Sequence, residues 1–243
     1  MLSKPGVSPE LTARQSLACC LRILAKEGWN ENFAGHITWQ LPDSQTMLCN
    51  PDSMWWQEVT AADISEVDFD GNVISGKWGV TEAVFLHTEL HRNRLDASVV
   101  VHGHPYYATV LSAIPALPYI HHQGSCVFDG ELALVNEYRG SIGNASEGQW
   151  LANTVGDASG VIMASHGALV TGADLATAAF RAINFERTCR ATLDLMKINK
   201  RPQDIPEQHR RFVYNWLLEK GKQYYWDGAV RQLIRSEPEV LDQ

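Results

Sequence analysis

The chain has 243 residues, 45% of them hydrophobic and 20% charged, a composition typical of a soluble globular protein with a single sizeable core. Its net charge of −8 argues against nucleic-acid binding, which requires a basic face. The sequence has neither an apolar run of about 20 residues for a membrane span nor an apolar signal segment near its start. We therefore expect a cytoplasmic protein that acts on a small-molecule substrate, with no nucleic acid and no membrane among its partners.

The first part of the chain alternates between helical and extended patterns. Ser8, Pro9 and Glu10 predict a helix start, because a hydroxyl cap, an early proline and an acid suit a helix N-terminus. The spacing of Thr60 and Asp63 resembles a capping box and predicts a short helical turn. The other elements predicted here are strands over 36–40 and 46–49, a hairpin over 67–74 and a helix over 81–93.

The second part continues the irregular alternation. Ser146 is predicted to open one helix, and Asp174 is predicted to cap a long helix that reaches about Asn199. The other elements predicted here are strands over 98–102, 132–135 and 161–164, a helix over 105–113 and one or two helices after residue 200. Because several strands pair as hairpins, we predict a single-domain α/β fold: a three-layer α/β/α sandwich around a mainly antiparallel central sheet.

Histidines lie at the ends of two apolar strands. Val99, Val100 and Val101 lead directly into His102-Gly103-His104, and alternate strand residues point to the same face, so His102 and His104 can hold one metal ion. His166 follows a second apolar strand at a His-Gly turn. Three neutral imidazoles that leave one coordination position open are typical of a catalytic divalent metal site. We predict zinc as the cofactor, with manganese or cobalt as alternatives.

These segments resemble the class II aldolase/adducin family. Val101–Pro105 and Ser165–Leu169, about sixty residues apart, match the two metal-binding segments of the family. Asn32–Thr38, near the start of the chain, matches a further family segment. The resemblance implies a fold like that of fuculose-phosphate aldolase over 8–200, with a helical extension over 201–243 that packs on the domain or on a neighbouring subunit. It also implies a homotetramer whose active sites lie between subunits.

The family also suggests which residues move protons. In its sugar-phosphate aldolases, a glutamate lies four residues before the histidine that matches His87, and that position is Ala83 here. We predict the adjacent Glu82 as the catalytic carboxylate; the alternative is an acid that only stabilises the helix N-terminus. His121 and His122 lie near the position of the family's general-acid tyrosine and are predicted to supply a proton, unless they are loop histidines with no role.

The segments around the predicted metal site suggest the substrate class. Where the sugar-phosphate members donate hydrogen bonds to phosphate, this chain has Asp52 and Glu82, whose carboxylates would repel a phosphate dianion. Carboxylates there disfavour a phosphorylated sugar, both for cleavage and for epimerisation. The residues expected to contact the substrate are His36, Asn32, Ser53 and Tyr106.

Two reactions fit a metal ion that stabilises an enolate. The leading prediction is a metal-dependent carbon–carbon lyase that cleaves a non-phosphorylated hydroxy-carbonyl or hydroxy-acid substrate by a retro-aldol reaction. The alternative is decarboxylation of a hydroxylated aromatic or heteroaromatic acid, favoured by the tryptophans Trp55, Trp56 and Trp78 near the expected pocket. A further alternative is a non-catalytic, adducin-like assembly module, because non-catalytic relatives also lack the acid at position 83.

Overall fold

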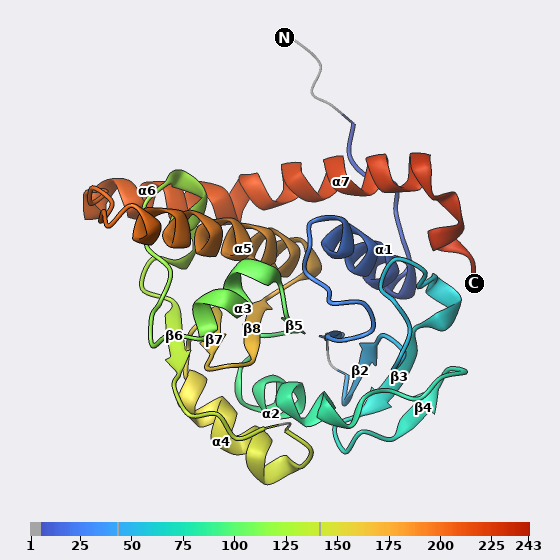
Figure 1. The fold of residues 1–243 in the computed structure, drawn as a ribbon. Helices are drawn as coiled ribbons and strands as arrows, with labels where there is room; N and C mark the ends of the chain where they lie inside the picture. The colour runs from blue at the N-terminus through green and yellow to red at the C-terminus, as the bar shows by residue number, and fades with distance from the viewer. Residues whose placement is uncertain (1–5, 43, 141) are drawn as a thin grey trace.

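The computed structural model describes residues 6–42, 44–140 and 142–243 and contains an eight-stranded sheet covered by helices on both faces (Figure 1). The strand order is β4-β3-β2-β1-β5-β8-β7-β6, and every neighbouring pair is antiparallel except β6 and β7. The strands are β1 His36–Gln40, β2 Thr46–Cys49, β3 Ser65–Asp68, β4 Val73–Ser75, β5 Val99–Gly103, β6 Leu132–Val135, β7 Gly160–Met163 and β8 Gly167–Gly172. This architecture confirms the predicted three-layer sandwich.

The helices form two layers. One face of the sheet is covered by α1, α3 and α5, with α7 packed on α1 and α5, and the other face is covered by α2 and α4 (Figure 1). The helices are α1 Ala13–Lys26, α2 Phe85–Asn93, α3 Tyr106–Ser112, α4 Ala145–Val155, α5 Leu175–Lys197, α6 Glu207–Trp216 and α7 Lys222–Ser236. Short 3-10 helices span Ala61–Asp63, Glu82–Val84, Gln123–Phe128 and Pro238–Leu241, and one π-helical turn, Leu217–Gly221, joins α6 to α7.

Strand alternation decides which side chains meet which helical layer. In β5, Val99 and Val101 belong to the core under α1 and α5, whereas Val100 belongs to the smaller core under α2 and α4. His102 lies two residues beyond Val100 and so faces the α2 layer. The register pairs His36 with His102, which places the His36 side chain on that same face. The metal-ligand candidates therefore lie between the sheet and α2.

Two predicted helix starts were wrong by a few residues. The first helix begins after Thr12, whose hydroxyl accepts the Gln15 N–H in a capping box. Ser8 instead hydrogen-bonds the carboxylate of Asp227, so it tethers the N-terminal segment to α7. Likewise, Asn144 rather than Ser146 caps α4. The caps predicted at Thr60 and Asp174 were confirmed, and Thr81 caps the 3-10 helix that leads into α2.

The C-terminal segment packs on the rest of the chain. Helix α7 lies against α1 and α5, and α6 is tied to the domain by Arg210, whose Nε lies 2.7 Å from Asp129 Oδ1. The predicted boundary at residue 200 falls in the segment between α5 and α6 and stays a prediction. None of the helices in the described ranges is both long enough and apolar enough to cross a bilayer.

Candidate metal centre

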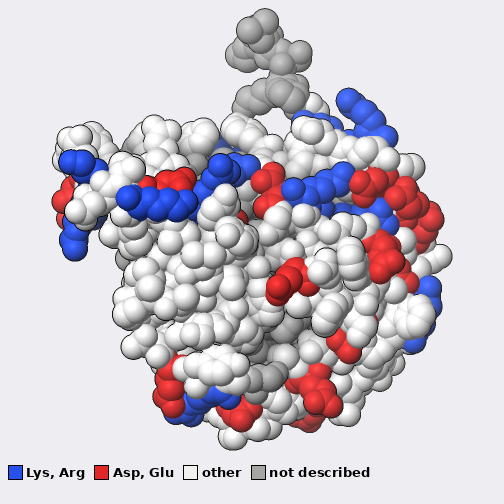
Figure 2. All heavy atoms as spheres, viewed as in Figure 1, with Lys and Arg blue, Asp and Glu red and all other residues white. Residues whose placement is uncertain are grey.

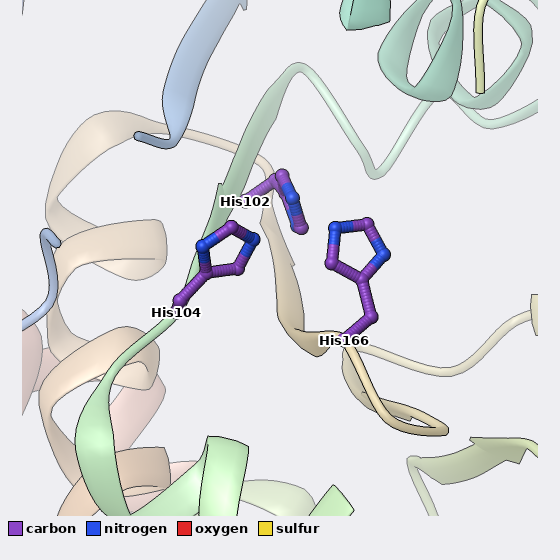
Figure 3. Close-up of side chains that lie close together, drawn as sticks. All are labelled: His102, His104 and His166. Carbon is purple, nitrogen blue, oxygen red and sulfur yellow. The ribbon is translucent and has the colours of Figure 1, made fainter. Parts of the chain in front are cut away.

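Three imidazoles converge where β5 ends (Figure 3). His102 is the next-to-last residue of β5, and His104 follows Gly103 on the same face of the extended chain. The ring centroids of His102 and His104 are 5.2 Å apart, and those of His166 lie 4.8 Å from His102 and 5.0 Å from His104. One ligand nitrogen from each ring lies within 4.8 Å of the other two. The predicted metal triad is therefore a real cluster in space.

Pairing between β5 and β8 brings His166 to the other two ligands. His166 lies in the tight turn from β7 to β8, where Ser165 adopts a left-handed conformation with φ of 53°. Gly103 pairs with Ala168 in the antiparallel ladder, so the residue just before β8 lies beside the end of β5. A glycine follows the histidine because a Cβ at Gly167 would lie 2.6 Å from the Gly103 carbonyl oxygen and 2.8 Å from His104 Cδ2.

Hydrogen bonds orient two of the three rings. His102 Nδ1 donates to the carbonyl oxygen of Ala168 at 3.0 Å, which leaves its Nε2 with a lone pair. His104 Nδ1 donates to the Glu31 carboxylate at 3.0 Å, and its Nε2 is buried with no partner among the described residues. Partners of this kind fix the tautomer and direction of metal-binding histidines. The donor set thus fits a divalent ion held by His102, His104 and His166.

The electrostatics of the cluster favour neutral imidazoles. Burial lowers the pKa of His102 well below its usual value, and the neighbouring histidines add to this effect. Burial, with His104 nearby, lowers the pKa of His166 to about 4. Neutral rings are the form that binds metal, so the cluster is ready to coordinate near neutral pH.

The metal cluster opens into a cavity of about 200 Å³. Asp52, which is exposed, provides the only carboxylate in its described lining, and no lysine or arginine is present there. The lining residues are Phe33, Ala34, Gly35, His36, Asn50, Pro51, Asp52, Thr81, Ala83, Leu86, His102, His104, Ile142 and His166. The pocket is therefore small, half apolar and without a cationic side chain.

Residues 15–193 match the family described as Class II Aldolase and Adducin N-terminal domain, and these residues include the metal cluster. The chain belongs to this family. A Caulobacter vibrioides protein provisionally named an aldolase class 2 protein is 28% identical over 96% of this chain and 93% of its own length. A solved aldolase II superfamily protein from Pseudomonas syringae aligns with a TM-score of 0.81 and 25% identity over 93% of this chain and 94% of that chain.

Relatives with named reactions include decarboxylases. The protein named Decarboxylase NovR, from Streptomyces niveus, is 28% identical over 81% of this chain and 74% of its own length. A 3-oxo-tetronate 4-phosphate decarboxylase from Pectobacterium atrosepticum is 28% identical over 77% of this chain and 87% of its own length. The family thus includes members named for aldolase and for decarboxylase reactions, and it supports a metal-dependent lyase as the class of this chain.

The structure does not bring every predicted site residue of this family member to the pocket. His36 lines the cavity with the three metal-ligand candidates, but Asn32, Ser53 and Tyr106 are exposed and are absent from its lining. Their contacts with substrate stay predictions.

The predicted proton-moving residues also lie outside this cavity. Glu82 is exposed in the first turn of its 3-10 helix, while Ala83 lines the cavity, because adjacent residues of such a helix point about 120° apart. His121 and His122 precede the 3-10 helix Gln123–Phe128, and His121 Nδ1 donates to the Tyr119 carbonyl oxygen at 2.8 Å. Within the described part of the chain, these three side chains do not reach the metal cluster, and their roles stay predictions.

A buried polar cluster beside the metal centre was missed by the sequence analysis. Thr38 Oγ1 lies 2.8 Å from His87 Nδ1 and 2.7 Å from His91 Nε2. His87 and His91 are four residues apart on α2 and so face the sheet together. This spacing was the available signal, but their partner Thr38 lies on β1 and reaches them only when α2 packs on the sheet.

Buried His91 predicts a loss of stability in acid. Burial lowers its pKa from 6.5 to about 4, so between these values the unfolded chain binds a proton that the folded chain does not. The free energy of unfolding is therefore unaffected by His91 protonation above pH 6.5, and it falls as the pH drops from 6.5 toward 4. In urea unfolding of the metal-free protein, the His91→Gln variant should be less stable than wild type at pH 7, and this gap should shrink by up to about 3 kcal/mol by pH 4. Parallel pH profiles for the two proteins would contradict this assignment.

Proposed function

We propose that this protein is a metal-dependent carbon–carbon lyase that acts on a small, non-phosphorylated acid. The observation that carries this proposal is the convergence of His102, His104 and His166, with their ligand nitrogens within 4.8 Å, at the base of a cavity. When bound there, a divalent ion supplies a Lewis acid for the negative charge that develops on a substrate oxygen as a carbon–carbon bond breaks. A non-catalytic assembly module would have no need for three such convergent, oriented imidazoles.

The cavity lining disfavours a phosphate group. The described lining residues include no lysine or arginine. They do include Asp52, whose carboxylate is exposed. On the face drawn in Figure 2, many of the Lys and Arg side chains lie in a band along the upper edge, where Asp and Glu side chains alternate with them. A dianion in the cavity would therefore meet a negative rather than a positive side chain. Neutral polar groups such as His36 suit a hydroxyl or carboxyl oxygen instead.

Decarboxylation is the reaction that the pocket favours. Loss of carbon dioxide breaks the bond to the carboxylate carbon, and its electron pair passes into an enolate, so the cleavage step needs no base; a proton then adds to the carbon. Retro-aldol cleavage first requires a base to take the proton of the substrate hydroxyl. Ala83 stands in the cavity where a carboxylate would serve as that base. Relatives at 28% identity include one named as a decarboxylase and one named as an aldolase class 2 protein, so the choice rests on the pocket.

Retro-aldol cleavage remains the second candidate because of Asp52. Its carboxylate lies at the rim of the same cavity and is the one acid among the described lining residues. Asp52 would then take the hydroxyl proton. The product separates the candidates, since retro-aldol cleavage releases an aldehyde or ketone and no carbon dioxide.

The experiment that tests the proposal starts from chelator-treated protein. Metal-free protein should be inactive, and zinc, manganese or cobalt should restore turnover of hydroxylated aromatic acids and small hydroxy acids. Carbon dioxide release would support decarboxylation, and aldehyde release would support the retro-aldol reaction. Full activity without metal, or failure to bind any divalent ion, would contradict the proposal.

We also propose that the protein forms a homo-oligomer, with a tetramer as the expected state. Helix α6 has no buried residue along its described length, and it exposes Phe212 by 72% and Trp216 by 44%. Apolar side chains of this size on one helix are typical of a surface that a second subunit covers. Sedimentation equilibrium should give a mass of several subunits, whereas a monomer at all concentrations would contradict this proposal.

A further inference from the structure

Four polar side chains are buried between β1 and α2, beside the metal centre but outside it. His36, Thr38, His87 and His91 are each at most 4% exposed. Burying polar groups costs free energy unless they are hydrogen-bonded, and aliphatic side chains would fill the same volume without that cost. The arrangement therefore needs an explanation beyond packing.

A chain of hydrogen bonds fixes the tautomers of two of these rings. His91 Nδ1 lies 2.8 Å from the Ala97 carbonyl oxygen, which only accepts, so Nδ1 carries the proton. In the neutral ring His91 Nε2 then accepts from the Thr38 hydroxyl at 2.7 Å. The Thr38 oxygen in turn accepts from His87 Nδ1 at 2.8 Å. We call these three residues the His91–Thr38–His87 column.

The His91–Thr38–His87 column ends against His36. The His36 and His87 rings stack with centroids 4.2 Å apart and planes 29° apart. His36 Nε2 is buried and has no partner among the described residues, yet His36 lines the cavity that contains the metal-ligand candidates. The ring is thus held on one side and has a polar atom to offer on the other.

We propose that the His91–Thr38–His87 column positions His36 so that its Nε2 forms a hydrogen bond with an oxygen of the bound substrate. This inference rests on the proposed lyase function of the metal centre. In this arrangement Thr38, His87 and His91 do not touch the substrate. They act through His36, because a stacked partner whose own tautomer and orientation are fixed limits the rotation of the His36 ring.

The test breaks the column at its centre with matched threonine variants. Thr38→Val keeps the side-chain shape and removes the hydroxyl, and Thr38→Ser keeps the hydroxyl. Thr171→Val is the control, because Thr171 is also a fully buried strand threonine but lies in β8, and among the described residues its hydroxyl contacts only Arg94, at 3.5 Å. Each variant is measured for metal content, kcat and KM, and for the ring ¹⁵N shifts of its histidines.

Loss of positioning should leave the metal in place. We expect Thr38→Val to retain wild-type metal content and to lose roughly tenfold in kcat/KM, about the effect of one misplaced hydrogen bond. Thr38→Ser and Thr171→Val should stay within about twofold of wild type by the same reasoning. In wild type His87 and His91 should both be Nδ1–H tautomers, and Thr38→Val should convert His87 to a mixture.

The outcomes separate this inference from the function on which it rests. Active wild-type protein with unchanged kcat/KM in Thr38→Val would overturn the positioning role alone. An Nε2–H tautomer of His87 in wild type, or loss of metal from Thr38→Val, would also overturn it, the latter in favour of a structural role. Metal-loaded wild-type protein without any lyase activity would overturn the proposed function and, with it, the substrate contact of His36.

Discussion

Replacement of His104 with alanine should remove the bound divalent ion and reduce carbon–carbon lyase activity by roughly 10³-fold or more, since the Lewis acid contributes several kcal/mol to the barrier. His104 is one of three candidate ligands, and its Nε2 is buried without a partner while its Nδ1 is held by Glu31. Two histidines alone would not hold the ion against competing water and buffer. Metal analysis of the purified variant, together with steady-state kinetics, measures both effects.

The matched control is His209→Ala. His209 is an exposed histidine on α6, so its loss removes an imidazole without touching the metal cluster. This variant should keep full metal content. If His104→Ala bound metal as tightly as wild type, or if both variants lost metal equally, the assignment of His104 as a ligand would be wrong.

Gly167→Ala should damage the metal centre although position 167 contributes no ligand. A Cβ there would lie 2.6 Å from the Gly103 carbonyl oxygen and 2.8 Å from His104 Cδ2, both too close for ordinary contact. The strand end or the His104 ring must therefore move, and overpacking of this kind costs about 1–3 kcal/mol. We expect metal affinity to fall roughly 10- to 100-fold, as it does when ligand-orienting groups are disturbed. Isothermal titration with zinc measures the affinity, and thermal unfolding measures the stability.

Gly228→Ala provides the comparison for this substitution. Gly228 lies in α7, and a Cβ there would meet no atom within 4 Å. Alanine is a better helix former than glycine, so this variant should be as stable as wild type or slightly more stable. Equal metal affinity in Gly167→Ala and Gly228→Ala would show that the close approach of β5 and β8 does not hold the ligands in place.

The sequence predicted the sheet and the metal ligands because both follow from local periodicity. Alternation along Val99–His104 places two imidazoles on one face whatever the rest of the chain does. The apolar strand before His166 and the turn after it are equally local signals. That the two segments share one ion was a hypothesis from their residue types, which the family resemblance strengthened, and the β5–β8 ladder shows that they meet.

Other parts of the site depend on contacts that no local pattern contains. A register count back from His87 gives Ala83, and Glu82 was predicted as the carboxylate next to that position; the first turn of the segment is a 3-10 helix that directs Ala83, not Glu82, to the cavity. The hydrogen bonds among Thr38, His87 and His91 join a strand to a helix about fifty residues later. Ser8 was predicted as a cap, but it pairs with Asp227 at the other end of the chain.

The central position of β5 in the strand order has a consequence for the lifetime of the protein. The strand that carries two of the ligands pairs with β1 on one side and β8 on the other, so those ligands cannot separate without disrupting the middle of the sheet. Binding of the ion is therefore linked to global rather than local opening. An ion present at 1,000 times its dissociation constant would add about 4.1 kcal/mol against such opening. Without the ion, global opening, and with it proteolysis, would then be more frequent.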